Sequence, residues 1–225
     1  MHALIVVAHP DPDSFTHRVA AELARGIADA PGGHTAEIAD LAAEDFDPRY
    51  NNADRAGYGS GSAPPPDVLL EQQRIDRCQA LVLVYPVYWW SFPALLKGWI
   101  DRVFSNGWAY RESPGEKLVK LLGRLPVHLV AIGGADAGTY DRHGYLPAMR
   151  IQIEHGIFDY CGAPVAGSRF LLDSHAPARV ALLEAAHDLG RGLFIQQSCG
   201  SGSAHERPER QVACSQRAGK SLHAL

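Results

Sequence analysis

Apolar runs typical of β-strands alternate along this chain with segments of helical periodicity. We expect strands at residues 2–8, 34–41, 80–87, 125–134 and 164–172, and helices at residues 14–30, 67–78, 93–104, 146–162 and 177–195. Because parallel strands need long crossover connections, which are usually helical, this alternation predicts an α/β fold. The expected architecture is a three-layer sandwich, in which a five-stranded parallel sheet lies between helices on both faces.

The length and composition fit one domain with a sizeable core. The chain has 225 residues, of which 46% are hydrophobic, and this is enough for a single buried core. We assign residues 1–195 to the folded domain and residues 196–225, which lack apolar periodicity, to a polar C-terminal tail. Residues 44–66 are rich in Gly, Ser and Pro and predict an irregular loop. The basic segment 116–124 is interpreted as a helix or a loop.

Charge and cysteine spacing exclude several classes of function. A net charge of -4 argues against a nucleic-acid surface, which is usually basic. The apolar run at the N-terminus is too short for a membrane span and lacks a basic flank, so we expect a cytoplasmic protein. Cys78, Cys161, Cys199 and Cys214 show no metal-ligand spacing. We therefore expect reduced thiols and no metal site.

The segments after the first, third and fourth strands carry the side chains most suited to a site. These segments are residues 9–16, 86–92 and 133–143. In an open parallel sheet with strand order 2-1-3-4-5, the carboxyl ends of these strands are neighbours, and ligands bind there. We therefore expect the three segments to meet in one cleft.

The first two segments each combine a candidate contact with an ordinary structural role. Ser14 and Thr16 lie where a helix N-terminus binds an anion, although a serine there is more often a plain cap. Trp89 and Trp90 are adjacent in the chain, so at least one of them is expected to face a cleft or another chain. Trp99 belongs to the apolar row of its helix and is expected in the core.

The third segment begins with Gly133-Gly134. Two glycines permit the close approach of a ligand, and they are equally typical of a simple turn. Tyr140 and His143 follow within reach of the same edge of the sheet, so we keep both as candidates for the cleft.

The stretch PVYWWSFPALLKGWIDRVFSNGWAY, residues 86–110, resembles the signature segment of a known family. This is the NAD(P)H:quinone oxidoreductase family, the DT-diaphorase-like flavoproteins of flavodoxin-like fold. The stretch is also similar to the small quinone reductases associated with bacterial potassium-efflux systems. The similarity extends from the first strand to residue 165, and it implies a flavodoxin-like strand order of 2-1-3-4-5.

The resemblance implies a flavin site at the three segments. His9, Ser14 and Phe15 match the family's H-x-x-x-x-S-F loop for the phosphate and adenosine. Thr16 and Ile132 stand where the family often has asparagine and threonine, so both are expected to bind mainly through their backbone. The implied flavin contacts are His9, Ser14, Phe15, Thr16, Gln72, Pro86, Val87, Tyr88, Trp89, Trp90, Ile132, Gly133, Gly134 and Tyr140.

The resemblance also implies catalytic roles for Tyr140 and His143. One of them, together with the N–H groups at Gly133-Gly134, would stabilise charge on the flavin, and the histidine would protonate the acceptor. Glu112 stands where the family has a second tyrosine of the acceptor pocket. The implied acceptor pocket contains Trp89, Trp90, Tyr110 and His143, with Tyr110 reaching it across a homodimer interface.

The implied activity is the two-electron reduction of quinones or related acceptors by NADH or NADPH. The mechanism would be ping-pong, in which nicotinamide and acceptor use the same place in turn. FAD is expected because His9, Phe15 and Gln72 match FAD-binding relatives, and FMN is the alternative. Two other functions stay open: a regulatory flavoprotein subunit in peripheral association with a membrane transporter, and a flavodoxin-like electron carrier.

Overall fold

The computed structural model describes residues 1–60, 63–172, 174 and 177–195. Its centre is a parallel sheet with strand order β2-β1-β3-β6-β7. When only the strands of this sheet are counted, this is the expected order 2-1-3-4-5, so the predicted fold class is confirmed. The strands are β1 (His2–Val7), β2 (Thr35–Asp40), β3 (Ala80–Pro86), β6 (Val127–Ile132) and β7 (Val165–Leu171).

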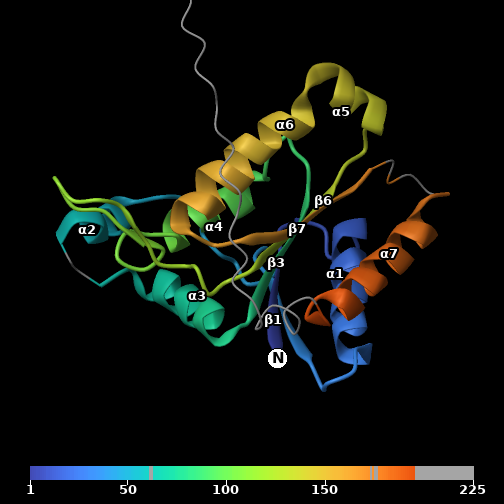
Figure 1. Cartoon of the computed structure of the whole chain (residues 1–225), viewed down its shortest axis with the longest axis horizontal. Coiled ribbons are helices and arrows are strands. Elements are labelled where there is room, and N and C mark those ends of the chain that lie inside the picture. Colours follow the sequence, from blue (N-terminus) through green and yellow to red (C-terminus); the bar gives the residue numbers. More distant parts are fainter. Residues whose placement is uncertain (61–62, 173, 175–176, 196–225) are drawn as a thin grey trace, which may run out of the picture.

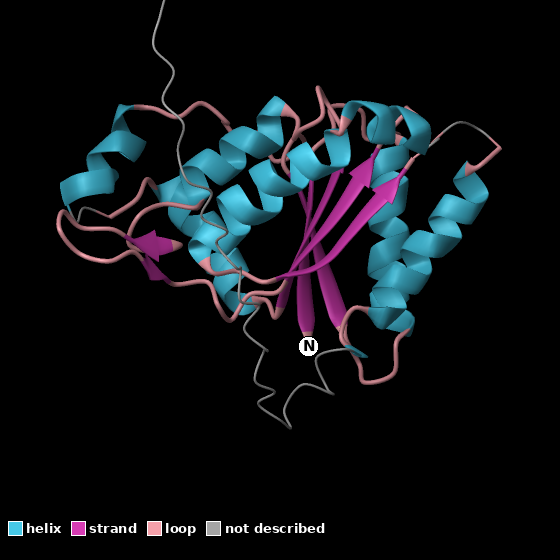
Figure 2. Cartoon of the chain, turned by 45° about the horizontal axis from the view of Figure 1, so that its top comes forward, coloured by secondary structure: helices cyan, strands magenta, loops and turns pink. Residues whose placement is uncertain are grey.

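Helices cover both faces of the sheet (Figures 1 and 2). Side chains alternate along β1, so Ile5 packs into one apolar core and Leu4 into another on the opposite face. The first core is covered by α1 (Phe15–Asp29) and α7 (Arg179–Gly192). The second is covered by α3 (Pro66–Arg77), α4 (Ala94–Val103) and α6 (Tyr145–Met149), which continues into the π-helix η1 (Arg150–Asp159).

Two glycines allow unusually close packing. A Cβ atom on Gly190 of α7 would stand 2.3 Å from the carbonyl oxygen of Leu23 in α1, so only glycine permits this helix crossing. A Cβ atom on Gly98 of α4 would stand 2.2 Å from the carbonyl oxygen of Pro48. The glycine of the stretch LLKGW therefore makes room for the chain that crosses α4.

The loop expected over residues 44–66 is wrong in part, because it contains the helix α2 (Asn52–Ser60). The Asn51 side chain accepts a hydrogen bond from the N–H of Ala53 (2.8 Å), and Asp54 Oδ2 accepts one from the N–H of Asn51 (2.8 Å). This reciprocal cap fixes the start of the helix. Asp54 also pairs with the buried Arg102 of α4 at 3.1 Å, so tertiary contacts hold α2 in place.

Three smaller differences from the expected elements are local. Within residues 116–124 the structure has the strand β5 (Val119–Lys120), which pairs antiparallel with β4 (Tyr110–Arg111). The third segment of the expected cleft contains a short helix, α5 (Ala137–His143). The helix expected at 146–162 begins at Tyr145, as α6, and ends at Asp159 with η1.

The two cysteines within the described residues are free and buried, as expected. Burial raises the pKa of Cys78 and of Cys161 to about 11. Cys199, Cys214 and the expected tail at 196–225 lie outside the described residues. Across the described part of the chain, no helix is both long and apolar enough to cross a membrane. The cytoplasmic location stays a prediction.

His128 is a buried polar group without a hydrogen bond. Within the described residues, neither of its ring nitrogens has a partner, and the residue is 7% exposed. Gly167, its neighbour on β7, leaves room for the ring, because a Cβ atom there would lie 3.1 Å from Nδ1. Burial lowers the pKa of His128 to about 4, so the folded protein holds this ring in its neutral form at neutral pH.

We predict that His128 makes the fold sensitive to acid. A histidine in the unfolded chain has a pKa of about 6.5, so between about pH 6.5 and about pH 4 only the unfolded state gains the proton. As the pH falls through this window, the free energy of unfolding should fall by about 3 kcal/mol. Above about pH 6.5 His128 should cause no such loss. Urea unfolding at about pH 7 and about pH 4.5 measures the drop in the free energy of unfolding. In His128→Leu this drop should be smaller, by the share that His128 causes. An equal loss in both proteins would rule this out.

Candidate active site

The candidate site lies where β1, β3 and β6 end, because the three strands are neighbours and run in the same direction. Val7 pairs with Val84 of β3, and Pro86 at the end of β3 pairs with Ile132 at the end of β6. The connections that follow therefore leave the sheet at one edge (Figure 2). This arrangement brings together the three segments that were expected to form a cleft.

The first connection presents hydrogen-bond donors at the start of α1. Ser14 is the N-cap, and its Oγ accepts a hydrogen bond from the N–H of His17 at 3.3 Å. The N–H groups of Phe15 and Thr16 lie in the first helical turn, where the helix itself offers no carbonyl partner. His9 Nδ1 lies 3.0 Å from the backbone nitrogen of Asp11 and 3.2 Å from its carbonyl oxygen, which holds the ring over this connection. This end of the site suits an anion.

Arg179 was not anticipated by the sequence analysis. Its guanidinium lies over the Phe15 ring, 5.2 Å from the ring centroid. Arg179 is the first residue of α7 and is far from Phe15 in sequence. It belongs to no sequence motif that would predict a contact with Phe15. It adds a positive charge near the start of α1.

The second connection is a tight turn that carries both tryptophans. Tyr88 and Ser91 exchange two backbone hydrogen bonds, at 3.2 and 3.0 Å. Trp89 has a φ of 50° and Trp90 a φ of 58°, which is the left-handed backbone that a two-residue hairpin turn requires. Side chains other than glycine rarely adopt it, at a cost of about 1–2 kcal/mol per residue. The sequence gives no sign of this backbone strain.

The two tryptophans point to different surroundings, as expected for adjacent residues. Trp89 is 94% exposed. Trp90 is half-buried and lies on the Tyr145 ring, with a centroid distance of 3.6 Å and an interplanar angle of 13°. His143 stacks on the same Tyr145 ring at 5.2 Å. Tyr145 was not among the expected site residues, yet it joins the second connection to the third.

The third connection corrects one expected contact. The N–H of Gly133 is donated to the Leu171 carbonyl oxygen at 3.0 Å, so it is already used by the sheet and does not serve as a donor to a ligand. A Cβ atom on Gly133 would stand 2.7 Å from Tyr140 Oη, whereas one on Gly134 would meet nothing within 4 Å. The space beside Gly134 is therefore open to a ligand.

Tyr140 and His143 have contrasting environments. Tyr140 is buried and meets the edge of Trp90 at 5.2 Å between ring centroids. Burial raises the pKa of Tyr140, so the phenol keeps its proton at neutral pH. His143 is exposed at the end of α5. The two residues come from one short helix but offer the cleft different chemistry.

Among the other expected contacts, Pro86, Val87, Tyr88 and Ile132 all lie at this edge of the sheet. Val87 and Ile132 join the second and third connections, because the N–H of Val87 is donated to the Ile132 carbonyl oxygen at 2.8 Å. Tyr88 is exposed beside Trp89. These positions agree with a cleft that the three connections share.

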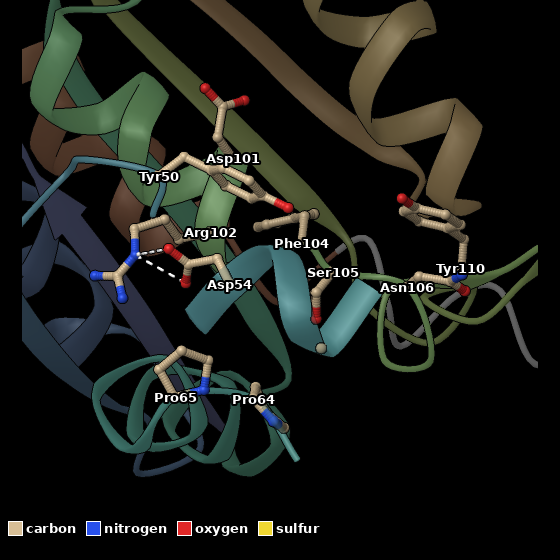
Figure 3. A pocket seen from close by; sticks show the side chains of 11 residues that line it. Tyr50, Asp54, Pro64, Pro65, Asp101, Arg102, Phe104, Ser105, Asn106 and Tyr110 are labelled. Carbon is tan, nitrogen blue, oxygen red and sulfur yellow. Dashed lines mark hydrogen bonds and ion pairs between the residues drawn. The ribbon is translucent and has the colours of Figure 1, made fainter. Parts of the chain in front are cut away.

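Gln72 and Tyr110 do not join this group. Gln72 is 3% exposed, and its amide nitrogen donates to the Val103 carbonyl oxygen (2.9 Å) and to Ser105 Oγ (3.0 Å). This side chain ties α3 to the end of α4, and the expected flavin contact at Gln72 stays a prediction. Tyr110 lines a second pocket, beside α2 and α4 (Figure 3).

The second pocket is rigidly built around Arg102. The guanidinium is 2% exposed and contacts Asp54 at 3.1 Å and Asp67 at 2.6 Å. Desolvation opposes ionisation of Asp67, but the hydrogen bond from Arg102 and its charge outweigh it and lower the Asp67 pKa. Figure 3 shows Arg102 and Asp54 on one side of the pocket and Tyr110 on the other. This pair anchors α2.

The residues at the first site fit a flat ligand with an anionic chain. Trp90 and Tyr145 supply planar apolar surfaces, the backbone beside Gly134 is open, and the start of α1 supplies donors for an anion. A flavin has this combination of a ring system and a phosphate. Within the described residues, no group of three or more His, Cys, Asp or Glu side chains could hold a metal ion.

Comparison with known proteins identifies the family. The family model described as Flavodoxin-like fold matches residues 1–191, and the chain belongs to this family. An uncharacterized NAD(P)H oxidoreductase of Haemophilus influenzae is 30% identical over 189 residues, which cover 83% of this chain and 92% of that protein. The match confirms the resemblance noted in the sequence.

Solved structures agree with this assignment. The NAD(P)H:quinone oxidoreductase from Methanothermobacter marburgensis superposes with a TM-score of 0.79 at 28% identity, over 86% of this chain and 98% of that chain. General stress protein 14 from Treponema denticola, solved in complex with FMN, superposes with a TM-score of 0.59 at 25% identity, over 84% and 95%.

We predict that Trp89→Gly stabilises the fold and weakens the site. Trp89 is almost fully exposed, so its removal loses little packing, while glycine adopts the positive φ without strain. The free energy of unfolding should rise by about 0.5–1 kcal/mol, measured by urea unfolding, whereas flavin affinity, measured by fluorescence titration, should fall.

Asp45→Gly is the matched control. Asp45 also has a positive φ, of 53°, but it follows β2 rather than β3. This variant should gain stability and keep its flavin affinity. Unchanged flavin binding in Trp89→Gly would remove Trp89 from the flavin contacts.

Proposed function

We propose that this chain is a flavin-dependent NAD(P)H oxidoreductase that reduces quinones and related acceptors by two electrons. The observation that carries the proposal is the convergence of the ends of β1, β3 and β6 at one edge of the sheet, beside the exposed Trp89. The names of the Haemophilus and Methanothermobacter relatives, an NAD(P)H oxidoreductase and an NAD(P)H:quinone oxidoreductase, support it. Fold alone would not decide the activity, so the site has to carry it.

Different residues of the site would contact different parts of a bound flavin. A bound flavin would supply the hydride chemistry, while the protein orients it and stabilises charge. The N–H groups of Phe15 and Thr16 would hold its phosphate, with Arg179 nearby. Trp90 would lie along the ring system, and the N–H of Gly134 would donate to its polar edge. Trp89, which projects into solvent, leaves an open face where nicotinamide and acceptor can stack in turn.

Two side chains of α5 are assigned to proton chemistry. Tyr140 keeps its proton because it is buried, so it serves as a fixed hydrogen-bond donor. His143 is exposed and stacks on Tyr145, which holds the ring at the mouth of the cleft and in contact with solvent. A histidine exchanges protons near neutral pH, so we assign to His143 the proton that the acceptor receives.

The flavin itself is either FAD or FMN. His9, Phe15 and Gln72, which match FAD-binding relatives, support FAD, the sequence-based prediction. The FMN in the Treponema relative supports the smaller cofactor. Release of the flavin from the purified protein, followed by chromatography, identifies it directly.

A homodimer completes the proposal. Ile151 of η1 is 67% exposed and Tyr160, directly after η1, is 39% exposed, and exposed apolar side chains beside a site favour an interface. Tyr110 contacts the edge of Tyr160 at 5.2 Å. A partner chain seated on this surface would bring Tyr110 toward the partner's cleft, where it would contact the acceptor.

The first prediction of this proposal concerns electron transfer. The purified protein should be yellow, NADH or NADPH should bleach it, and menadione should restore the colour. Initial rates at several concentrations of both substrates should give the parallel lines of a ping-pong reaction. His143→Gln should slow the return of the colour by about tenfold or more, and leave the bleaching unchanged.

Other outcomes separate the alternatives. A yellow protein that neither nicotinamide bleaches would favour an electron carrier. A protein that bleaches but does not pass electrons to menadione would favour a regulatory flavoprotein bound to a transporter. A chain that takes up no added flavin would overturn the proposal.

The second prediction concerns assembly. Light scattering should give twice the 24.4 kDa mass of one chain. Ile151→Glu should give a folded monomer. Its kcat/KM for menadione should be about one tenth of the wild-type value or lower, which equals at least about 1.4 kcal/mol of lost transition-state stabilisation. Leu70→Glu, on the exposed face of α3 (61% exposed), is the control and should remain an active dimer. A fully active wild-type monomer would exclude the shared cleft.

A further inference from the structure

A chain of hydrogen bonds joins the start of α1 to the end of β2. His17 Nε2 lies 2.8 Å from Asp40 Oδ2, and His17 Nδ1 lies 2.8 Å from Ser14 Oγ. The His17 and Asp40 side chains are only 15% and 21% exposed, and Ser14 is buried. The three side chains are therefore fixed relative to one another, directly beside the donors expected to hold a phosphate.

The direction of each hydrogen bond follows from the chemistry of the groups. An ionised carboxylate only accepts, so His17 Nε2 carries a proton and donates it to Asp40. In a neutral imidazole Nδ1 is then an acceptor, and the Ser14 hydroxyl donates to it. Ser14 Oγ also accepts from the N–H of His17. With His17 neutral, the only proton of the Ser14 hydroxyl is committed to His17 and does not reach a ligand.

A protonated His17 reverses one of these bonds. The imidazolium donates from both nitrogens, to Asp40 as before and now to Ser14 Oγ. The Ser14 hydroxyl proton is then free to point at a phosphate oxygen, and the ring adds a positive charge close to it. Because a phosphate accepts hydrogen bonds only, it favours this state over the neutral one.

The other groups that face His17 come from the first connection and from the end of β2. The His9 ring lies 6.2 Å away between centroids, and Asp11 and Asp13 lie in the same connection. Asp40 Oδ1 accepts from the N–H groups of Ala42 (3.1 Å) and Ala43 (3.2 Å). These bonds fix the Asp40 carboxylate in place, with Oδ2 facing His17 Nε2.

We propose that His17, held by Asp40, is a phosphate-positioning residue of the flavin site, and that binding of the flavin phosphate is coupled to protonation of His17. The inference rests on the proposed function, because it assumes that the chain binds a flavin at this cleft. It goes further by naming a residue outside the expected contacts and a thermodynamic consequence. Coupling of this kind is reciprocal, so acid should strengthen the binding of the phosphate and the phosphate should draw a proton to the site.

The test compares flavins with and without a phosphate. The full-length protein, freed of flavin by dialysis, is titrated with FMN or riboflavin in a calorimeter, in two buffers of different ionisation enthalpy, between about pH 6.5 and about pH 8. FMN binding to the wild type should take up as much as one proton more than FMN binding to His17→Gln. The FMN dissociation constant should rise by as much as tenfold per pH unit in the wild type relative to this variant.

The comparison with the variant removes the ionisation of FMN itself. A phosphate monoester has a second pKa of about 6, and this contribution is the same for both proteins. Riboflavin should show no difference between them. Asp40→Asn, which removes the counter-charge, should also reduce the proton uptake. His187→Gln is the matched control, because His187 pairs with Asp29 at 3.0 Å, at the other end of α1. It should behave as the wild type.

The possible failures are distinguishable. If the protein binds none of FMN, riboflavin and FAD, the proposed function fails, and if it binds FAD alone, FAD replaces FMN in the same comparison. If FMN binds but wild type and His17→Gln take up the same number of protons, this inference is overturned while the proposed function stands. Circular dichroism of each variant checks its fold, and should His17→Gln fail to fold, Asp40→Asn decides by the same comparison.

Discussion

The parallel pairing of β1, β3 and β6 determines where the helices pack and where the candidate site lies. Helices cover both faces of these strands, so the sheet presents ligand-binding groups only where the strands end. Because the three strands are parallel, their carboxyl ends lie at the same end of the sheet. The register that pairs Pro86 with Ile132 places the second and third connections side by side. The position of the site follows from this pairing before any catalytic side chain is considered.

Stability and function oppose one another in the turn after β3. Trp89 and Trp90 both adopt a backbone that favours glycine, and Trp89, which is almost fully exposed, gains no core packing in return. The strain is balanced by the two Tyr88–Ser91 backbone bonds, by the Ser91 hydroxyl bond to Gln152 of η1 (3.0 Å), and by the stacking of Trp90 on Tyr145. Strained residues held in place by surrounding contacts are characteristic of ligand sites.

The elements that the sequence predicts well are those whose signal is local. The apolar run ALVLVYP became the central strand, and Trp99 is fully buried, with its indole nitrogen donating to Glu71 at 2.8 Å. Elements held by tertiary contacts were missed. The helix α2 depends on the pairing of Asp54 with Arg102, far away in sequence, although the spacing of Asn51 and Asp54 does carry a capping signal.

The site was predicted less completely than the fold, for the same reason. Ser14 was recognisable as a cap, but the reach of His17 to Asp40 appears only when β2 lies beside α1. Tyr145 has no motif of its own and enters the site by stacking. Gln72 was assigned because it matches a glutamine of the family. In the structure its amide nitrogen donates to the Val103 carbonyl oxygen and so joins α3 to α4. A resemblance transfers residue types, and the packing decides which of them face a ligand.

We propose that the ends of β1, β3 and β6 together form a single flavin site. A crystal structure of the purified protein with its flavin tests this most directly. We expect electron density for the ring system against Trp90 and Gly134, with the phosphate on the N–H groups of Phe15 and Thr16. Density for the flavin in the pocket around Arg102, or at any other place on the chain, would contradict it.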